Sequence, residues 1–366
     1  MNGKNAATHG GNLYAALRQT GGDLKNILDF SANINPLGLS ERIRQTLHAS
    51  LESIIHYPDA HGFDLKQAIS QHYHMNTELI TLGNGAVELM YILCHMLNPK
   101  SVLVTAPTFS EYEGAARASG ATIEYLYLHA DNNFTIDIKG MAERLTTMDI
   151  VFICNPNNPT GVLLNNIQIE ELLIAATASN TYVVVDESFI DFLPNDDVYT
   201  CRQLLTRYPN LIILHSLTKF YAIPGLRLGF ALANPELTKL LHRGKDPWNV
   251  NTLAQKAGVT ALSDYTYQQL SKEFMKKNKM DLYHSLLAIP GLKPYLPSVN
   301  FILINITETN MTGKELQQAM ATHNILIREC SNYPGLSSEY IRIAVKQPEE
   351  NNKLIETLKK VIGRVL

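Results

Sequence analysis

The residues with the strongest chemical implications lie in SLTKFYAIPGLRLGF, residues 216–230. This segment has a serine at position 216, a lysine at 219 and an arginine at 227. A lysine amine among apolar neighbours has a lowered pKa, so it can act as a nucleophile that forms a Schiff base. Ser216 and Arg227 are residue types that bind phosphate. The alternative is that Lys219 is an ordinary solvated lysine, but its apolar neighbours argue against this.

Three further segments place glycines or polar residues directly after apolar runs. In VVVDES (183–188), Asp186 ends a buried run, where its charge needs a cationic partner such as a protonated ring nitrogen. CNPNNPTG (154–161) predicts a rigid loop that holds Asn157 toward the edge of a sheet. GNGAVELMYILCHML (83–97) opens a helix whose free N–H groups can bind an anion. The plainer alternatives are a helix cap or metal ligand for Asp186, a simple turn for the loop, and a glycine cap for the helix.

Short apolar runs rich in Val and Ile predict the strands that position these groups. Helical segments lie between these runs from about residue 64 to residue 235, which predicts an α/β domain with a mostly parallel sheet. In such sheets, ligands bind beyond the carboxyl ends of the strands, where all four chemical segments fall. The predicted strands are SVLVTAP (101–107), ATIEYLYL (121–128), DIVFICNP (149–156), TYVVVDE (181–187), NLIILHS (210–216) and LRLGFALA (226–233).

The pattern changes after Asn251 to a long polar helical stretch ending near Leu287, followed by two or three strands and a final helix over 348–366. This predicts a smaller α+β domain. The Gly- and Asn-rich start, including SANINPLGLS (31–40), is typical of an extended arm. We therefore expect an arm and part of the small domain in residues 1–45, a large ligand-binding domain in 46–255 and a small C-terminal domain in 256–366.

Composition limits the function classes. A chain of 366 residues with a net charge of -3 and no basic cluster predicts a small-molecule ligand, and neither a nucleic acid nor a membrane partner. The start has no apolar signal core and the four cysteines are widely separated, so we expect a cytoplasmic protein with reduced thiols. The twelve histidines form no metal-ligand spacing, so no metal site is expected.

Taken in order, the glycine-rich turn, NPNNPTG, DE and S-x-T-K-x-x-x-x-P-G-x-R-x-G resemble the motifs of fold-type I pyridoxal-phosphate enzymes over nearly the whole chain. The resemblance implies the fold of these transferases, pyridoxal 5'-phosphate as cofactor and a homodimer. It implies that Lys219 binds the cofactor covalently, that Asp186 keeps the pyridine nitrogen protonated, and that Asn157 bonds the phenolic oxygen. It also assigns cofactor contacts to Gly85, Ala86, Phe109, Ser216, Arg227 and, from the neighbouring subunit, Tyr57.

Further segments resemble the histidinol-phosphate aminotransferase branch and, within it, the threonine-phosphate decarboxylases of cobalamin biosynthesis. The discriminating segments are HGGN (9–12) and REC-SNYPGL around Arg328. Two arginines can bind a phosphate and a carboxylate as bidentate partners. The plainer alternatives are a functionless terminus for the arm and surface salt bridges for the arginines. The resemblance assigns substrate contacts to His9, Gly10, Asn33, Asn157 and Arg328, and the carboxylate end to Arg342.

The implied reaction is decarboxylation of L-threonine O-3-phosphate to (R)-1-amino-2-propanol O-2-phosphate. L-Serine O-phosphate, which would give ethanolamine phosphate, stays open because a single methyl contact changes discrimination by only ~1–3 kcal/mol. Phe189 stands where many aminotransferases have a tyrosine, in agreement with a decarboxylase. The alternatives are a histidinol-phosphate aminotransferase and a ligand-binding domain of a transcriptional regulator. We disfavour the latter because the sequence shows no DNA-binding segment.

Overall fold

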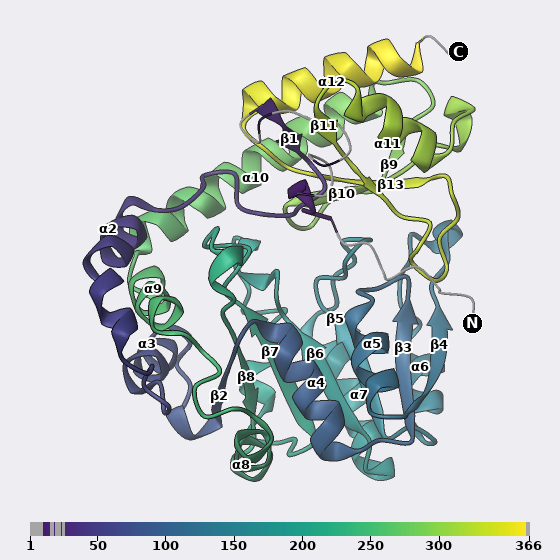
Figure 1. The fold of residues 1–366 in the computed structure, drawn as a ribbon. Helices are drawn as coiled ribbons and strands as arrows, with labels where there is room; N and C mark the ends of the chain where they lie inside the picture. The colour runs from purple at the N-terminus through teal and green to yellow at the C-terminus, as the bar shows by residue number, and fades with distance from the viewer. Residues whose placement is uncertain (1–9, 15–17, 19–22, 24–25, 364–366) are drawn as a thin grey trace.

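The computed structural model describes residues 10–14, 18, 23 and 26–363. These residues form a large lobe around a seven-stranded sheet and a small lobe around a four-stranded sheet (Figure 1). Helix α10 (Tyr265–Leu287) joins the lobes, because it contacts Ile190–Phe192 in the large lobe and both β9 (Lys293–Pro294) and α12 (Pro348–Ile362) in the small lobe.

The large sheet has the strand order β2-β8-β7-β6-β5-β3-β4. Strands β3 to β7 pair in parallel, whereas β8 runs antiparallel to its neighbours β2 and β7, so the predicted mostly parallel α/β sheet is confirmed. All six predicted strands are present. The strand over residues 80–83 was missed, because ITLG is too short to give a pattern. The strands are β2 (Ile80–Gly83), β3 (Ser101–Ala106), β4 (Thr122–Tyr127), β5 (Ile150–Cys154), β6 (Tyr182–Asp186), β7 (Leu211–Ser216) and β8 (Gly229–Ala233).

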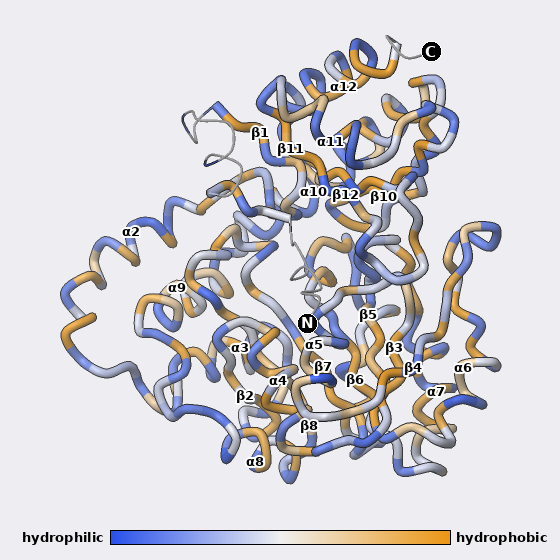
Figure 2. Tube along the Cα trace, turned by 45° about the vertical axis from the view of Figure 1, so that its right-hand side comes forward, coloured by the Kyte–Doolittle hydropathy of each residue, from blue (hydrophilic) through white to orange (hydrophobic). Residues whose placement is uncertain are grey.

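Helices cover both faces of this sheet, so its central strands are buried on two sides and hydrophobic throughout (Figure 2). Helices α4 (Ala86–Leu97), α5 (Glu111–Ala118) and α8 (Pro235–Gly244) pack on one face. The other face is covered by α6 (Ile138–Leu145) and α7 (Asn166–Ser179), with α3 (Phe63–Tyr73) and α9 (Thr252–Leu262) packing beside β8; α2 (Glu41–Ala49) packs on α9.

Strand alternation decides which polar residues face the ligand-binding side. Val184 packs in the core under α4, whereas Val183 and Val185 pack in the core on the opposite face. Since side chains alternate along a strand, Asp186 shares the α4 side with Val184. On β7, Ser216 shares that side with Ile212 and Leu214 by the same rule. The last residues of two neighbouring strands therefore meet beside the N-terminus of α4.

The small lobe has the strand order β12-β13-β10-β9, with all pairs antiparallel. Near the start of the chain, β1 (Leu28–Asp29) pairs in parallel with β11 (Ile325–Leu326), which attaches the segment after the arm to this lobe. The remaining elements are β10 (Phe301–Asn305), α11 (Gly313–Ala321), β12 (Arg328–Glu329) and β13 (Tyr340–Ala344). None of the helices in the described residues has the length and apolar character that a membrane span needs.

Candidate active site

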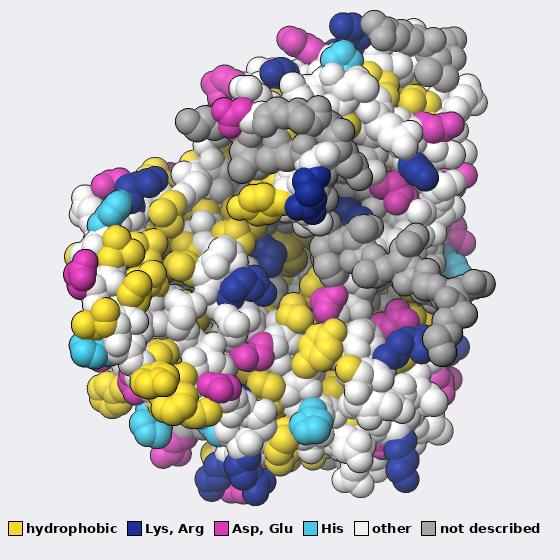
Figure 3. All heavy atoms as spheres, in the orientation of Figure 1, with side chains coloured by type: hydrophobic (Ala, Val, Ile, Leu, Met, Phe, Trp, Pro, Cys, Tyr) yellow, Lys and Arg dark blue, Asp and Glu magenta, His cyan; other side chains and the backbone are white. Residues whose placement is uncertain are grey.

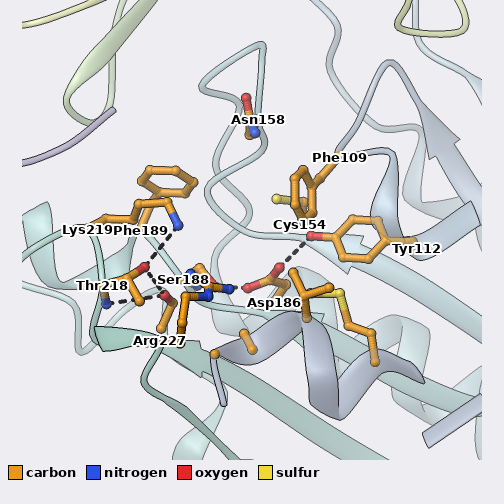
Figure 4. Close-up of a pocket in the computed structure, with 15 residues that line it drawn as sticks. Phe109, Tyr112, Cys154, Asn158, Asp186, Ser188, Phe189, Thr218, Lys219 and Arg227 are labelled. Atoms are coloured by element: carbon orange, nitrogen blue, oxygen red, sulfur yellow. Dashed lines mark hydrogen bonds between the residues drawn. The ribbon is translucent and has the colours of Figure 1, made fainter. Parts of the chain in front are cut away.

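A pocket lies where the carboxyl ends of the central strands meet the N-terminus of α4 (Figure 4). It encloses about 480 Å³ of space, its open mouth included. Seven of the nine residues that the resemblance assigns to the cofactor line it: Gly85, Ala86, Phe109, Asp186, Ser216, Lys219 and Arg227. The other lining residues are Val87, Met90, Tyr112, Cys154, Asn158, Ser188, Phe189 and Thr218.

Lys219 follows β7 and points its amine into the pocket, where Nζ donates a hydrogen bond to Thr218 Oγ1 at 3.0 Å (Figure 4). Burial, followed by the charges of Arg227 and Arg342, lowers the pKa of Lys219 to about 8, against the opposite effect of Asp186. An amine with this pKa is partly neutral near neutral pH, which a Schiff-base nucleophile requires. Lys219 is therefore not the solvated surface lysine of the alternative interpretation.

Asp186 is a buried carboxylate, 4% exposed, that ends β6. Tyr112 donates its hydroxyl hydrogen to Oδ2 at 2.6 Å, and the backbone N–H of Ser188 donates to Oδ1 at 2.9 Å. Burial and the charge of Asp186 raise the pKa of Tyr112, so the phenol stays protonated and remains a donor. Because both donors are neutral, the buried charge still requires a cation, and a protonated pyridine nitrogen would supply one. The described residues contain no cluster of three or more His, Cys, Asp or Glu that could hold a metal.

An anion cradle lines the same pocket at the N-terminus of α4. Gly85, at φ 81°, precedes α4 and contributes no side-chain cap, so the first N–H groups of the helix stay open to the pocket. The backbone there is too close to its neighbours for a side chain. A Cβ on Gly85 would lie 2.6 Å from Arg227 Nη2, and one on Gly229 would lie 2.5 Å from Ala86 N. With Ser216 added, these donors suit the phosphate of pyridoxal phosphate.

Asn157, which the resemblance assigns to the cofactor and substrate, forms hydrogen bonds to other residues of the chain. Asn157 does not line the pocket, and its amide is already engaged. Thr108 donates to its Oδ1 at 2.7 Å, while its Nδ2 donates to Pro107 O at 3.0 Å and to Thr160 Oγ1 at 2.8 Å. Asn157 therefore fixes the shape of the loop, and the pocket receives the next residue, Asn158.

Asn158 lies on the loop that overhangs the pocket (Figure 4), and its Oδ1 accepts a hydrogen bond from Arg342 Nη1. This bond orients the amide, so that Nδ2 stays available to a ligand. The motif has two consecutive asparagines, and neighbouring side chains point to different sides of an irregular loop. Residue type alone could not decide which of the two faces the ligand.

Arg328 and Arg342 are buried, 6% and 4% exposed, and their Cα atoms are register partners on β12 and β13. Arg342 Nη2 donates to Ser31 O at 2.9 Å, and Arg328 Nη2 donates to Asn332 Oδ1 at 2.7 Å. These acceptors are neutral, and within the described part of the chain the Nε atom of each arginine has no partner. Burial rules out a surface salt bridge, and two buried guanidinium groups on neutral partners require anions. Figure 3 shows Lys or Arg side chains in the hollow between the lobes.

The N-terminal arm reaches the same region. Gly11 N donates to Ser31 Oγ at 2.8 Å, and a Cβ on Gly10 would lie 2.1 Å from Ser31 O, the atom that accepts from Arg342. Asn33 is buried, and its Oδ1 has no partner among the described residues. His9, which the resemblance assigns to the substrate, lies outside the described residues.

Tyr57 lies apart from the pocket of its own chain. It is 79% exposed and stacks on Trp248 with ring centroids 4.6 Å apart. Phe109 and Phe189 do line the pocket, and Phe189 packs edge-on against Phe301 in the small lobe at 5.2 Å. Phe189 has no group that can form a hydrogen bond to the cofactor.

Several residues that shape the site were not predicted from the sequence. Tyr112 and Ser188 hold Asp186, and Thr218 bonds both Lys219 Nζ and Ser216 Oγ. Thr218 could have been predicted from the motif, since it lies in the sequence between Ser216 and Lys219, the two residues that it contacts. Tyr112 carried no such signal, because its contact joins α5 to β6 across 74 residues.

The fold and the site together define a fold-type I pyridoxal-phosphate enzyme, as predicted. The family model for aminotransferase class I and II matches residues 25–358, so the chain belongs to this family. Pyridoxal 5'-phosphate is the cofactor of this family, and therefore of this chain.

Three curated relatives match over nearly the whole chain. A threonine-phosphate decarboxylase from Salmonella typhimurium is 35% identical, with 97% of each chain covered. An adenosylcobalamin biosynthesis bifunctional protein CobDQ from Leptospira interrogans is 36% identical over 98% of this chain and 41% of that protein. A histidinol-phosphate aminotransferase from Cupriavidus pinatubonensis is 32% identical over 94% of this chain and 91% of that protein.

Two solved structures give the same pair of activities. A histidinol-phosphate aminotransferase from Clostridium acetobutylicum has a TM-score of 0.87 at 29% identity, and an L-threonine-O-3-phosphate decarboxylase from Porphyromonas gingivalis has 0.82 at 27%. Each comparison covers 92% of this chain and 100% of the other. Since both activities occur on this fold, the residues that hold the substrate must distinguish them.

Proposed function

We propose that this chain decarboxylates L-threonine O-3-phosphate and releases (R)-1-amino-2-propanol O-2-phosphate. The observation that carries the proposal is the pair of buried guanidinium groups, Arg328 and Arg342, whose hydrogen-bond acceptors are all neutral. A substrate with both a carboxylate and a phosphate supplies one anion to each. The names of two relatives, a threonine-phosphate decarboxylase and an adenosylcobalamin biosynthesis protein, agree with this substrate and with a role in cobamide assembly.

The residues of the pocket have different roles in the proposed reaction. Bound pyridoxal phosphate supplies an electron sink for the electron pair left at Cα when CO2 departs. Lys219, with its lowered pKa, would hold the cofactor through its amine, and the same Nζ would serve as the group that delivers a proton to Cα. Asp186 would keep the ring nitrogen of the cofactor protonated, and Tyr112 and Ser188 hold Asp186 in place.

We assign to Arg342 the role of selecting which Cα bond breaks. The Cα bond that stands perpendicular to the cofactor ring is the one that cleaves, so the group that fixes the carboxylate selects decarboxylation. Arg342 is held by Ser31 O and by Asn158 Oδ1, and it lies over the ring of Phe301 at 5.4 Å. Asn158, in place of Asn157, is the residue that we assign to the cofactor's phenolic oxygen. Phe189 cannot share this role.

We also propose roles for the N-terminal arm and for a partner subunit, and a cellular compartment. Gly10 lies against Ser31, whose carbonyl oxygen accepts from Arg342, and we assign Gly10, Asn33 and His9 to the substrate as the resemblance implies. Exposed Tyr57 is assigned to the phosphate of a neighbouring subunit's cofactor in a homodimer. The expected setting is the cytoplasm.

One assay tests the proposed function. Purified holoenzyme is incubated with threonine phosphate or serine phosphate without any keto acid, and CO2 and the amine product are measured. We expect stoichiometric CO2 and aminopropanol phosphate, with serine phosphate turned over less well.

The second candidate, histidinol-phosphate aminotransferase, is favoured by the relatives that carry this activity. Strict dependence on 2-oxoglutarate with histidinol phosphate, and no CO2, would replace the decarboxylase by that enzyme.

A further inference from the structure

Tyr333 lies between the two substrate arginines and contacts both. The guanidinium carbon of Arg328 lies 5.2 Å from the centroid of its ring, and Arg342 Nη1 approaches its hydroxyl oxygen at 3.5 Å. The tyrosine is 6% exposed, so these contacts are shielded from water. Tyr333 is not among the residues that the family resemblance assigns to the site.

The backbone holds Tyr333 firmly in this place. Its N–H donates to Cys330 O at 3.1 Å and its carbonyl accepts from Leu336 N at 3.0 Å, so turns on both sides fix the loop between β12 and β13. The same loop packs against the large lobe, because a Cβ on Gly335 would lie 3.1 Å from Ala106 O at the end of β3. The ring is thus anchored at the junction of the two lobes.

A tyrosine suits this position better than a carboxylate. Two guanidinium groups on register partners repel each other, and each needs a partner that fixes its direction. A carboxylate would fix them but would also neutralise them, and it would compete with the anions of the substrate. An aromatic ring offers a negative face to one cation, and its hydroxyl oxygen offers a lone pair to the other, without adding a charge.

We propose that Tyr333 is a positioning residue that selects phosphorylated substrates by holding Arg328 for the phosphate while Arg342 takes the carboxylate. The inference rests on the proposed function and deepens it. Ring and hydroxyl have separate tasks: the ring face sets Arg328, and the hydroxyl supports Arg342, which Ser31 and Asn158 already hold. The ring is therefore the part that phosphate recognition requires.

The test weakens the ring face without changing its shape. Phenylalanine and its mono- to trifluorinated analogues are placed at position 333, since ring fluorines withdraw electron density from the face. Inorganic phosphate binding to the holoenzyme is then measured by thermal stabilisation, which follows the dissociation constant of the ligand. The holoenzyme is used because the cofactor's own phosphate then fills the cradle at α4. We expect Tyr333→Phe to stay within about two-fold of wild type and the trifluoro variant to weaken phosphate binding about five- to ten-fold.

Two controls separate positioning from a structural effect. The same analogues at Tyr340, also buried in the small lobe but in ring contact with Phe134 and Tyr295, should leave phosphate binding unchanged. In an Arg328→Gln background, fluorination at position 333 should have no further effect, because coupled residues are not additive. The KM for threonine phosphate should rise along the series while kcat stays constant.

Phosphate binding that is indifferent to fluorination, or that changes equally in the Arg328→Gln background, would overturn the inference. Loss of binding along the Tyr340 series to the same extent would also overturn it. Failure of the proposed function has a different signature, since it would show as a wild-type holoenzyme that releases no CO2 from threonine phosphate. The phosphate titrations do not depend on that turnover, so the two failures are distinguishable.

Discussion

The cofactor end of the large lobe and the arginine pair of the small lobe are built in different ways. In the large lobe, Asp186 and Ser216 end neighbouring parallel strands, and Lys219 follows three residues after Ser216. In the small lobe, Arg342 is fixed by Ser31, 311 residues away in the sequence, and by Asn158, 184 residues away. The first site is set by sheet geometry, and the second by the packing of distant segments.

This difference separates two tasks. The strand ends hold the groups that make any Cα chemistry feasible, whereas the arginines and their supports decide which substrate enters and which bond is aligned. Substitutions in the first region should therefore lower kcat for every substrate. Those in the second should change substrate preference.

The largest effect is expected from Lys219→Ala. The variant loses both the amine that binds the cofactor and the group that delivers the proton to Cα, so turnover should fall at least about a thousand-fold. The absorbance of the covalently bound cofactor should disappear as well. If the variant keeps this absorbance, Lys219 does not bind the cofactor and the proposed chemistry has no basis. If activity survives although the absorbance is lost, another residue transfers the proton to Cα.

Asp186→Ala should come next, with kcat lowered by about two to three orders of magnitude, since a preorganised charge at a reacting centre is worth this much. Cofactor binding should change far less, because the phosphate cradle at Gly85 and Arg227 is untouched. Equilibrium dialysis with pyridoxal phosphate, run beside the activity assay, separates the two effects. Equal losses of binding and turnover would mean that Asp186 serves to bind the cofactor and does not serve to keep its ring nitrogen protonated.

The same contrast explains what the sequence could predict. The strands and their order along the chain followed from apolar runs, and the carboxyl ends of those strands indicated where the chemical segments containing Asp186 and Ser216 would meet. Tyr112 was not predictable in this way, because its contact with Asp186 joins elements whose packing is set by the whole fold. Tyr333 lies close to Arg328 in the sequence, but the direction of its ring depends on the conformation of the loop between β12 and β13.

Asn157 and Asn158 show that residue types alone do not predict which of two adjacent side chains faces a pocket. Both asparagines belong to one motif, and the loop places only the second against the pocket. The neighbouring hydroxyls of Thr108 and Thr160 hold the first in its structural role. A motif gives the chemistry that a loop offers, but side-chain direction depends on backbone angles that residue types do not fix.

The two asparagines also form a matched pair for experiment. Asn158→Ala should lower kcat/KM about ten- to hundred-fold, since it removes a hydrogen bond to the ligand and one support of Arg342. Asn157→Ala should instead lower the melting temperature, because Thr108 and Pro107 lose their partner. Kinetics and thermal unfolding of both variants distinguish the roles, and equal effects in both assays would contradict the assignment of Asn158.

The smallest effect is expected in the pH dependence of cofactor capture. The pKa of Lys219 is lowered from its usual value to about 8, so the neutral amine forms at a lower pH than for an exposed lysine. Covalent attachment of pyridoxal to the apoenzyme should therefore speed up about ten-fold from pH 7 to pH 9 and then level off, whereas an exposed lysine would keep gaining. Arg342→Gln removes one charge that lowers this pKa, so the midpoint should move upward. A midpoint that stays fixed in this variant would mean that Arg342 has no effect on the pKa of Lys219, and this arginine of the small lobe would then be electrostatically independent of the amine.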